Sequence, residues 1–341
     1  MGRYRLCRRR SAHQIHVGQG EEEIAQEPAI QPAGAKIDVG IAAIEQLSRY
    51  GAGSSLWRDA FRRLSRNRLA ILGLVIIVAI GLVAIFAPYV APYRYDRIFP
   101  GEIIKDPSSK HLMGTNLTGQ DTLSRIIYGA RNSLSVGIFV QFIILSIAVL
   151  VGGAAALGSK WLDTILMRFT DVVYAFPDLL FIILLQQVLA TRWPWLANQI
   201  GGLLVVFLAI GLVSWVTVAR LIRGQMLSLK ERDFVLAARA MGATRFRIVV
   251  HHMLPHTIGP IIVALTFGIP AAIFTLTTLS VIGIGIQPPL ADWGNMIYAG
   301  YGPILSTPWP AFFPAAALAI VFISFQFLGD GLRDALDPRT R

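Results

Sequence analysis

The stretch LAILGLVIIVAIGLVAIFAPYVAPY, Leu69–Tyr93, contains no charged residue and is long enough to cross a membrane as a helix. About 20 apolar residues span the roughly 30 Å hydrocarbon core of a bilayer. Three further stretches are also uncharged, and another is interrupted only by His256: Ser133–Gly158, Trp193–Ala219, Trp293–Gly329 and Met253–Leu290. Segments this long and this numerous exceed what one soluble core can bury, so the sequence predicts an integral membrane protein.

Six transmembrane helices account for the pattern, and the fold class predicted is an all-α polytopic membrane protein. The third span is the hardest to place, because the uncharged run Leu179–Thr191 is too short and the helix must reach back through Asp178 towards Asp171. Pro177 is expected to kink it, and Arg168 lies three residues from Asp171, close enough to pair. The other spans are expected at about Leu69–Tyr89, Ser133–Leu157, Ile200–Ala219, Thr257–Ile284 and Trp309–Leu328.

The net charge of +11 is explained by arginines beside the spans. Such residues are retained on the cytoplasmic side, which predicts that both termini are cytoplasmic. The loop 94–132 is then external, although it carries basic residues of its own and is near the length at which the rule loses force. Nucleic-acid binding is not expected, because no basic patch interleaved with aromatic residues accompanies the charge. The arginines are Arg58, Arg62, Arg63, Arg66, Arg68, Arg220, Arg223, Arg333, Arg339 and Arg341.

Outside the spans, residues 1–55 are expected to form a disordered cytoplasmic extension. Residues 56–93 are expected to hold an interfacial helix and the first span. The segment Leu56–Arg68 suits an amphipathic helix on the inner leaflet, or a solvated basic linker. The core of the protein is predicted at 133–330, with a cytoplasmic loop at 228–255 and a cytoplasmic tail at 331–341.

No set of residues for catalysis, a cofactor or a metal is evident. Gly153–Lys160 resembles a phosphate-binding loop, but its Ser and Lys stand in reverse order. His252 and His256 are spaced as zinc ligands can be, yet Pro255 lies between them and no third ligand follows. The only cysteine, Cys7, cannot form an internal disulfide.

Polar groups inside the spans have two interpretations. Asp171 and Asp178 are carboxylates within the third span, where such groups often mark a substrate or ion path. Gln186, Thr275 and Thr278 are further path candidates. The alternatives are interfacial placement of the two carboxylates and interhelical hydrogen bonds for the other three.

The loop Ser228–Pro255 carries the most specific pattern outside the spans. A helix can begin at Ser228 or Asp233, and Phe234, Ala237, Ala238 and Met241 recur on one side of it. Gly242 is the expected left-handed stop. Thr244 can cap a second helix, which Pro255 is expected to limit at the start of the fifth span.

The run Ala237–Gly242, followed by Leu254-Pro255, resembles the EAA-type signature of ABC importer permeases, with Leu236 where the signature has Glu. In that family the loop forms a coupling helix that sits in a groove of a cytoplasmic ATPase. The resemblance therefore implies a set of docking residues, namely Phe234, Ala237, Ala238, Arg239, Ala240, Met241, Gly242, Ala243, Leu254 and Pro255.

Four more segments match the dipeptide/oligopeptide/nickel subfamily of these permeases, so the resemblance covers about Leu56–Arg339. They are His111–Arg131, Arg168–Pro177, Gly283–Trp293 and Leu328–Pro338. Asn116 and Gln120 stand where the subfamily has an Asp and an Arg, which suggests that an ion pair became neutral at both ends. The implied fold is that of a type I (MetI-like) ABC importer permease with six spans.

The resemblance implies a non-catalytic permease subunit of an ATP-driven importer of di- and oligopeptides in the bacterial cytoplasmic (inner) membrane. Its partners would be membrane lipid, a second homologous permease, two cytoplasmic ATP-binding subunits and an extracytoplasmic solute-binding protein, with a path lined mainly by spans three to five. One alternative is import of nickel or another small solute by the same machinery. An ion-coupled carrier that uses Asp171 and Asp178 is an alternative of another class.

Overall fold

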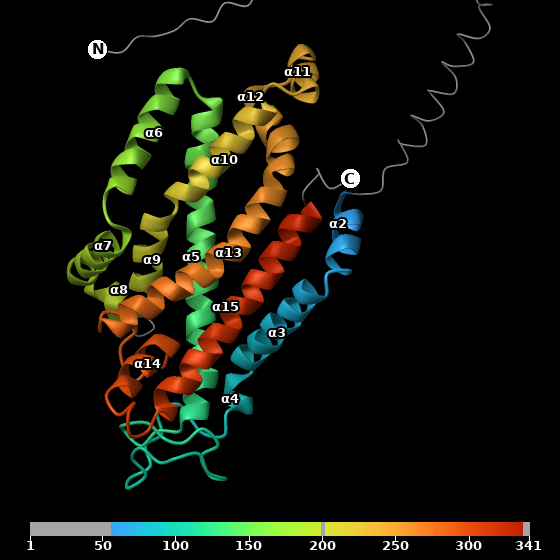
Figure 1. Ribbon diagram of the computed structural model, residues 1–341. Coiled ribbons are helices and arrows are strands. Elements are labelled where there is room, and N and C mark those ends of the chain that lie inside the picture. The colour runs from blue at the N-terminus through green and yellow to red at the C-terminus, as the bar shows by residue number, and fades with distance from the viewer. Residues whose placement is uncertain (1–55, 199–201, 337–341) are drawn as a thin grey trace, which may run out of the picture. The chain divides into compact units, whose positions relative to one another are not determined.

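The computed structural model describes residues 56–198 and 202–336, and the regular secondary structure of this part of the chain is helical, with two isolated β-bridges in addition (Figure 1). The predicted disordered extension 1–55 and the last residues of the tail lie outside the described residues. Four helices are long and apolar enough to cross a membrane, and two bent helix pairs raise the number of candidate spans to six. The prediction of an all-α polytopic fold is confirmed.

The first span is α3, Arg68–Ile85, preceded by the short helix α2, Leu56–Leu64. Asn67 caps α3 by accepting the amide of Ala70 at 3.2 Å. Both helices pack against the last helix, α15, Trp309–Leu336. A side chain at Gly331 of α15 would collide with Ala70, so glycine permits this close approach. The sixth span thus runs beyond its predicted end at Leu328.

The second span, α5, covers Thr122–Leu157 and begins well before the predicted Ser133. Asp121 caps it by accepting the amide of Ser124 at 2.8 Å. At about 1.5 Å per residue its 36 residues extend roughly 54 Å, so α5 is longer than the hydrocarbon core of a bilayer. It packs against α3, α9, α10 and α13 and is central to the bundle.

The third span is broken. α6, Lys160–Ala175, and α7, Asp178–Arg192, meet at 93° across Phe176-Pro177. Phe176 adopts an extended conformation, as expected for a residue before proline. The predicted disruption at Pro177 is confirmed, and it is a sharp break between two helices.

The fourth span is also bent, by 44°, between α9, Leu203–Ser214, and α10, Val216–Leu229. The fifth is α13, Leu254–Val281, which contains Pro260 and Pro270. The remaining helices are α4 (Ala87–Val90), α8 (Pro194–Asn198), α11 (Asp233–Ala240), α12 (Arg245–Arg247), the π-helix η2 (Ile248–Met253) and α14 (Trp293–Tyr301).

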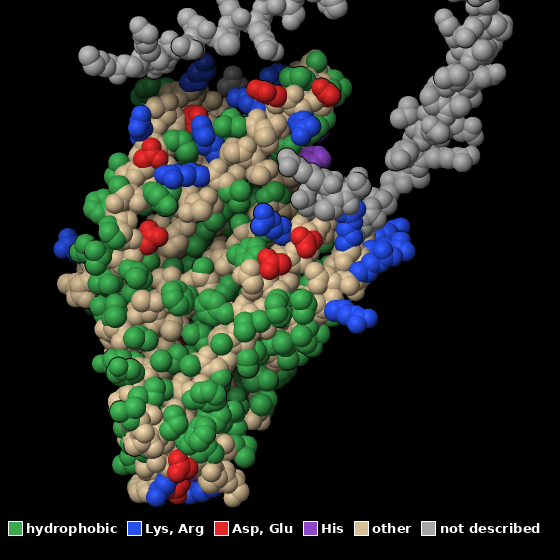
Figure 2. Space-filling model, in the orientation of Figure 1, with side chains coloured by type: hydrophobic (Ala, Val, Ile, Leu, Met, Phe, Trp, Pro, Cys, Tyr) green, Lys and Arg blue, Asp and Glu red, His purple; other side chains and the backbone are tan. Residues whose placement is uncertain are grey.

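The surface in Figure 2 is dominated by hydrophobic side chains over the middle of the bundle. Lysines and arginines gather at the end that carries α2 and α11, and a smaller charged group lies at the opposite end (Figures 1 and 2). This distribution suits a protein whose two ends face water and whose middle faces lipid.

Candidate functional site

The connection between α10 and α13 forms the predicted helix and glycine corner. α11 ends at Ala240 with Met241 as its C-cap residue, and Gly242 follows with a φ of +80°. The amides of Gly242 and Ala243 donate to the carbonyls of Arg239 and Ala238, at 3.0 and 3.1 Å. This is the Schellman arrangement, which favours glycine at the left-handed position. The predicted stop at Gly242 is confirmed.

The two faces of α11 differ in exposure. Val235 and Ala238 are buried in the hydrophobic core that also contains Ile248 and Met253. Of the four residues predicted to recur on one side of this helix, Ala238 is buried and not exposed like Met241, because it follows Val235 by one helical turn and packs with it against the chain. Ala237, Arg239, Ala240 and Met241 are exposed, Met241 at 81%.

Three large apolar side chains border this exposed face. The ring of Phe234 packs on His256 of α13, with 4.8 Å between ring centroids, and is partly exposed. Leu236 and Phe246 are also exposed, Phe246 at 74%. Sequence reasoning did not assign Phe246 to the docking set, although it lies two residues beyond the expected cap at Thr244.

The helix after the corner does not stop at Pro255, so that predicted limit is wrong. Thr244 accepts the amide of Arg247 at 3.3 Å, which is the capping contact predicted for it. α12 then runs through η2 directly into α13. The wider turn of the π-helix, with Leu254 donating to Val249, accommodates Pro255 in the first turn of α13, where no amide is needed. Leu254 is half-buried, and Pro255 is exposed.

The sequence suggested that Asp171 pairs with Arg168, but in the structure it pairs with a different arginine. Its Oδ1 accepts a hydrogen bond from Arg220 Nη2 of α10 at 2.8 Å, and the same guanidinium covers the ring of Tyr174 at 4.8 Å. Asp178 is exposed and is the first residue of α7, directly after the break. A carboxylate is favourable at a helix N-terminus.

A second ion pair joins the same two helices. Arg223 of α10 forms a two-point contact with Asp163 of α6, with N–O distances of 2.5 and 2.6 Å. Both side chains are about three-quarters buried. We call this contact and Arg220–Asp171 the α6–α10 ion pairs. Sequence reasoning missed both, because their members lie far apart along the chain.

The remaining path candidates separate into two kinds. Gln186 Nε2 donates to the carbonyl of Ile284 at 2.6 Å, which ties α7 to the segment after α13. Its Oε1 is buried without a hydrogen-bond partner among the described residues. Thr275 and Thr278 each donate to the carbonyl four residues earlier in α13, at 3.0 Å, so neither hydroxyl donates to another helix.

The segment before α5 folds around a buried histidine. His111 lies between Glu102 and Asp121, with Nε2 and Nδ1 each 2.8 Å from a carboxylate oxygen. Contacts with Lys110 and His111 hold the pKa of Glu102 below its usual range. Asn116 Nδ2 donates to Gln120 Oε1 at 3.0 Å, so the two neutral replacements contact each other as predicted.

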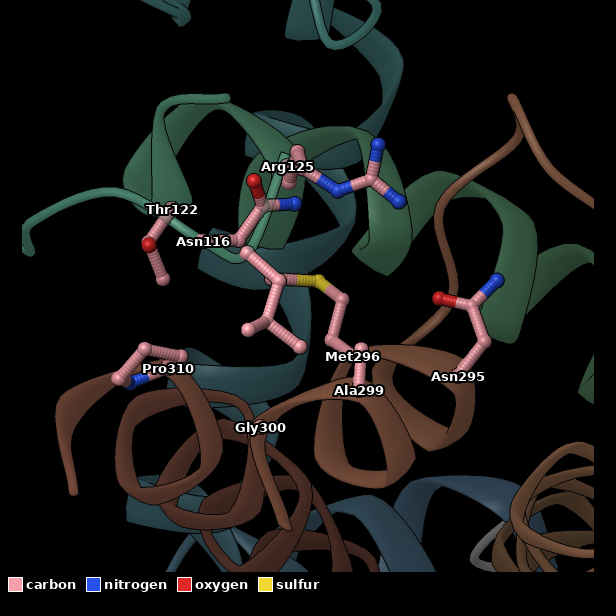
Figure 3. Close-up of a pocket in the computed structure, with 9 residues that line it drawn as sticks. Asn116, Thr122, Arg125, Asn295, Met296, Ala299, Gly300 and Pro310 are labelled. Atoms are coloured by element: carbon pink, nitrogen blue, oxygen red, sulfur yellow. The ribbon is translucent and has the colours of Figure 1, made fainter. Parts of the chain in front are cut away.

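A small cavity of about 30 Å³ lies beside this segment, between α5 and the α14–α15 region (Figure 3). Arg125 Nη1 donates to Gln120 Oε1 at 2.8 Å, but its Nε has no partner within the described chain. The hydroxyl of Thr122 is likewise buried and unpartnered. The cavity has room for one or two water molecules, which would satisfy such groups.

The α14 capping residue, Asp292, is fully buried near this cavity. Its carboxylate accepts the amides of Gly294 and Asn295, and Ser280 donates to it at 3.3 Å. Burial nevertheless raises the pKa of Asp292 to about 6. Within the described residues, no group of three or more His, Cys, Asp or Glu side chains is arranged to hold a metal ion.

The geometry is that of a multi-span membrane protein with an exposed helical corner at one end. Residues 121–341 match the model of the family described as "Binding-protein-dependent transport system inner membrane component". Residues 55–108 match the N-terminal transmembrane domain of oligopeptide transport permease C. The chain belongs to the family of binding-protein-dependent transport system inner membrane components, the permease subunits of ABC importers.

Curated relatives cover most of the chain. The oligopeptide transport permease OppC of Bacillus subtilis is 40% identical over 84% of this chain and 91% of the relative. The dipeptide transport permease DppC of the same organism is 40% identical over 84% and 87%. OppC of Escherichia coli K12 is 37% identical over 85% and 93%.

The fold is similar to a solved structure of the methionine ABC transporter MetNI in an inward-facing conformation. That match has a TM-score of 0.51 at 19% identity and covers 62% of this chain and 96% of the other. The predicted MetI-like fold is thereby confirmed. The family model and the curated relatives confirm the predicted membership of the permease family and show a multi-pass, non-catalytic inner-membrane subunit.

Proposed function

We propose that this chain moves di- and oligopeptides through the inner membrane as one of two homologous permeases of an ATP-driven importer. The relatives of similar length are named for oligopeptide and dipeptide transport, which supports peptide as the cargo. Two cytoplasmic ATP-binding subunits and an extracytoplasmic solute-binding protein complete the proposed assembly. The α11 end faces the cytoplasm, and the segment before α5 faces outward.

The observation that carries the mechanism is the unbroken helix from α12 through α13, joined to the exposed face of α11 by the corner at Gly242. The proposed ATPase contact is formed by Ala237, Arg239, Ala240 and Met241. Small alanines permit close approach of a partner, and the exposed Met241 adds an adaptable apolar contact. Displacement of α11 by the ATPases would be passed to the fifth span, because a helix transmits tilt along its length.

The docking proposal is tested with Ala237→Asp and Met241→Asp in the full chain, co-expressed with its neighbouring transporter subunits. We expect normal membrane insertion but loss of the ATP-binding subunits during purification. Ser65→Asp is the matched control, because Ser65 is exposed at the same end but lies outside α11. Full retention of the ATPases by both α11 variants would contradict the proposal.

The cargo is tested by uptake of labelled tripeptide and of nickel into cells that lack and then regain this gene. We expect peptide uptake to return and to require the ATP-binding subunits. Restored nickel uptake without peptide uptake would favour the alternative cargo. Uptake that survives removal of the ATPases and collapses with the proton gradient would indicate an ion-coupled carrier.

A further inference from the structure

A hollow of about 410 Å³ lies between α5, the first turns of α9 and the segment that precedes α5. Its volume falls in the range of roughly 300–1,000 Å³ that is usual for small-molecule sites. The described residues that line it are Tyr95, Tyr128, Arg131, Asn132, Ser135, Phe139, Leu203, Phe207 and Leu290.

Two aromatic pairs form much of its wall. The rings of Tyr95 and Tyr128 lie 5.0 Å apart in a tilted arrangement. The rings of Phe139 and Phe207 stack at 5.5 Å, across α5 and α9. Paired aromatic rings offer a rigid apolar surface at little cost in side-chain entropy, and tyrosine adds a polar hydroxyl. The hollow is therefore suited to an apolar side chain with polar groups beside it.

Arg131 is the only charged residue among the described residues that line the hollow. It is exposed, and within the described chain its guanidinium takes part in no hydrogen bond or ion pair. Arg125, on the same helix, is instead held by Gln120 and the carbonyl of Tyr95. Arg131 thus brings an uncommitted planar cation to an aromatic hollow, an arrangement that fits a carboxylate.

The rim next to Arg131 is fixed by hydrogen bonds. Asn132 Nδ2 donates to the carbonyl of Ala291 at 2.7 Å, which links α5 to the segment before α14. Ser135 donates to the carbonyl of Asn132 at 2.7 Å. Arg131 lies nine residues into α5, about 14 Å from its start. Because α5 exceeds the membrane thickness, this position falls near the outer boundary of the bilayer.

We infer that the hollow binds the C-terminal end of a peptide as it enters the path, with Arg131 binding the free carboxylate and the aromatic walls contacting the last side chain. The inference rests on the proposed function and assigns the end of the cargo that this chain recognises. Amidation of the peptide removes the negative charge and one acceptor oxygen. A charge-assisted contact of this kind separates acid from amide by roughly tenfold to a hundredfold in affinity.

The test measures binding of a fluorescent tetrapeptide, as free acid and as C-terminal amide, to the full transporter in nanodiscs without its binding protein. We expect the acid to bind more tightly by the factor given above. Arg131→Gln should abolish this preference by weakening acid binding alone. Arg131→Lys should retain part of it, since charge without the planar fork is a weaker carboxylate ligand. Arg192→Gln removes an exposed arginine outside the hollow and should leave the preference unchanged.

Equal binding of acid and amide by the unmodified transporter would overturn the inference, as would an unchanged preference in Arg131→Gln. Peptide uptake by cells that carry the same variants separates this failure from failure of the proposed function. If the unmodified gene restores no peptide uptake, the proposed function fails. If it does and the acid preference is absent, only the role of Arg131 fails. Thermal unfolding of each variant checks that folding is intact.

Discussion

The ion pair between Arg223 and Asp163 should be a main connection between α6 and α10. The two helices make few other contacts, whereas α10 packs extensively on α5. We therefore predict that Arg223→Gln and Asp163→Asn each destabilise the chain and that the double variant is little worse than either single one. The reason is that each single change leaves the other charge three-quarters buried without its partner.

The magnitude follows from exposure and geometry. The side chains of Arg223 and Asp163 are 29% and 24% exposed, and they form two short, charge-assisted bonds. Such bonds contribute about 1.5–3 kcal/mol. The second pair, Arg220–Asp171, is 37% and 54% exposed with one bond, which places it in the range of about 0.2–1 kcal/mol. The Arg223–Asp163 pair should therefore contribute more to the stability of the chain than the Arg220–Asp171 pair.

The assay is a double-mutant cycle on the full chain. Denaturant titration in mixed micelles gives the free energy of unfolding of the unmodified chain, of each single variant and of the double variant. We expect an interaction energy of about 2 kcal/mol for Arg223–Asp163. The same cycle on Arg220–Asp171 is the internal comparison. Additive effects of Arg223→Gln and Asp163→Asn would refute the reasoning, because they would show that the two side chains do not stabilise each other.

Three further outcomes are expected. Asp292→Asn should remove a pH dependence of the free energy of unfolding. The pKa of Asp292 in the folded chain, about 6, exceeds the usual 3.8, so its contribution to stability is present below about pH 4 and is lost as the pH rises through 6. Melting temperatures of the unmodified chain and the variant, measured across this pH range, check the prediction. Gly242→Val should lower the free energy of unfolding by about 1–2 kcal/mol, because the φ of +80° at this position is unfavourable for a residue with a side chain even though no neighbouring atom is close. Gly242→Asn should keep ATPase binding in co-purification, because asparagine tolerates this conformation. Gly331→Leu should push α3 away from α15 at Ala70 and lower the melting temperature, since overpacking costs about 1–3 kcal/mol.

The spans were predictable because uncharged length is a local property of the sequence. The uncharged stretch Leu69–Tyr93 is consistent only with a membrane helix, and the observed helix begins within one residue of the predicted start. The corner at Gly242 and the break at Pro177 were predictable for a similar reason. Each depends on one residue whose backbone preferences are strong enough to decide the local conformation.

Contacts between helices were not predictable in the same way. Asp163 and Asp171 pair with arginines that the sequence shows only as positive residues beside the fourth span. Which face of α10 meets α6 is set by packing and by the 44° bend before Val216. Pro255 misled the sequence analysis because the π-helix η2 supplies a wider turn that a periodic pattern does not reveal.

The positions of the two helix breaks determine how motion of α11 could reach the hollow. α11 is joined to α13 through the corner at Gly242 and the continuous helix α12–η2, and to α6 through α10 and the α6–α10 ion pairs. The hollow, in contrast, is lined by α9 and α5, beyond the bend that separates α9 from α10. Helices are stiffer than the junctions between them. A displacement of α10 therefore moves α9 if the bend at Trp215 keeps its angle, and leaves α9 in place if the angle of the bend changes. This residue is buried, and its ring stacks on Phe169 of α6 at 6.3 Å, so the bend and the ion-paired helices share one contact. A displacement of α10 that moves α9, and so changes the width of the hollow, therefore also moves Trp215 relative to Phe169 of α6.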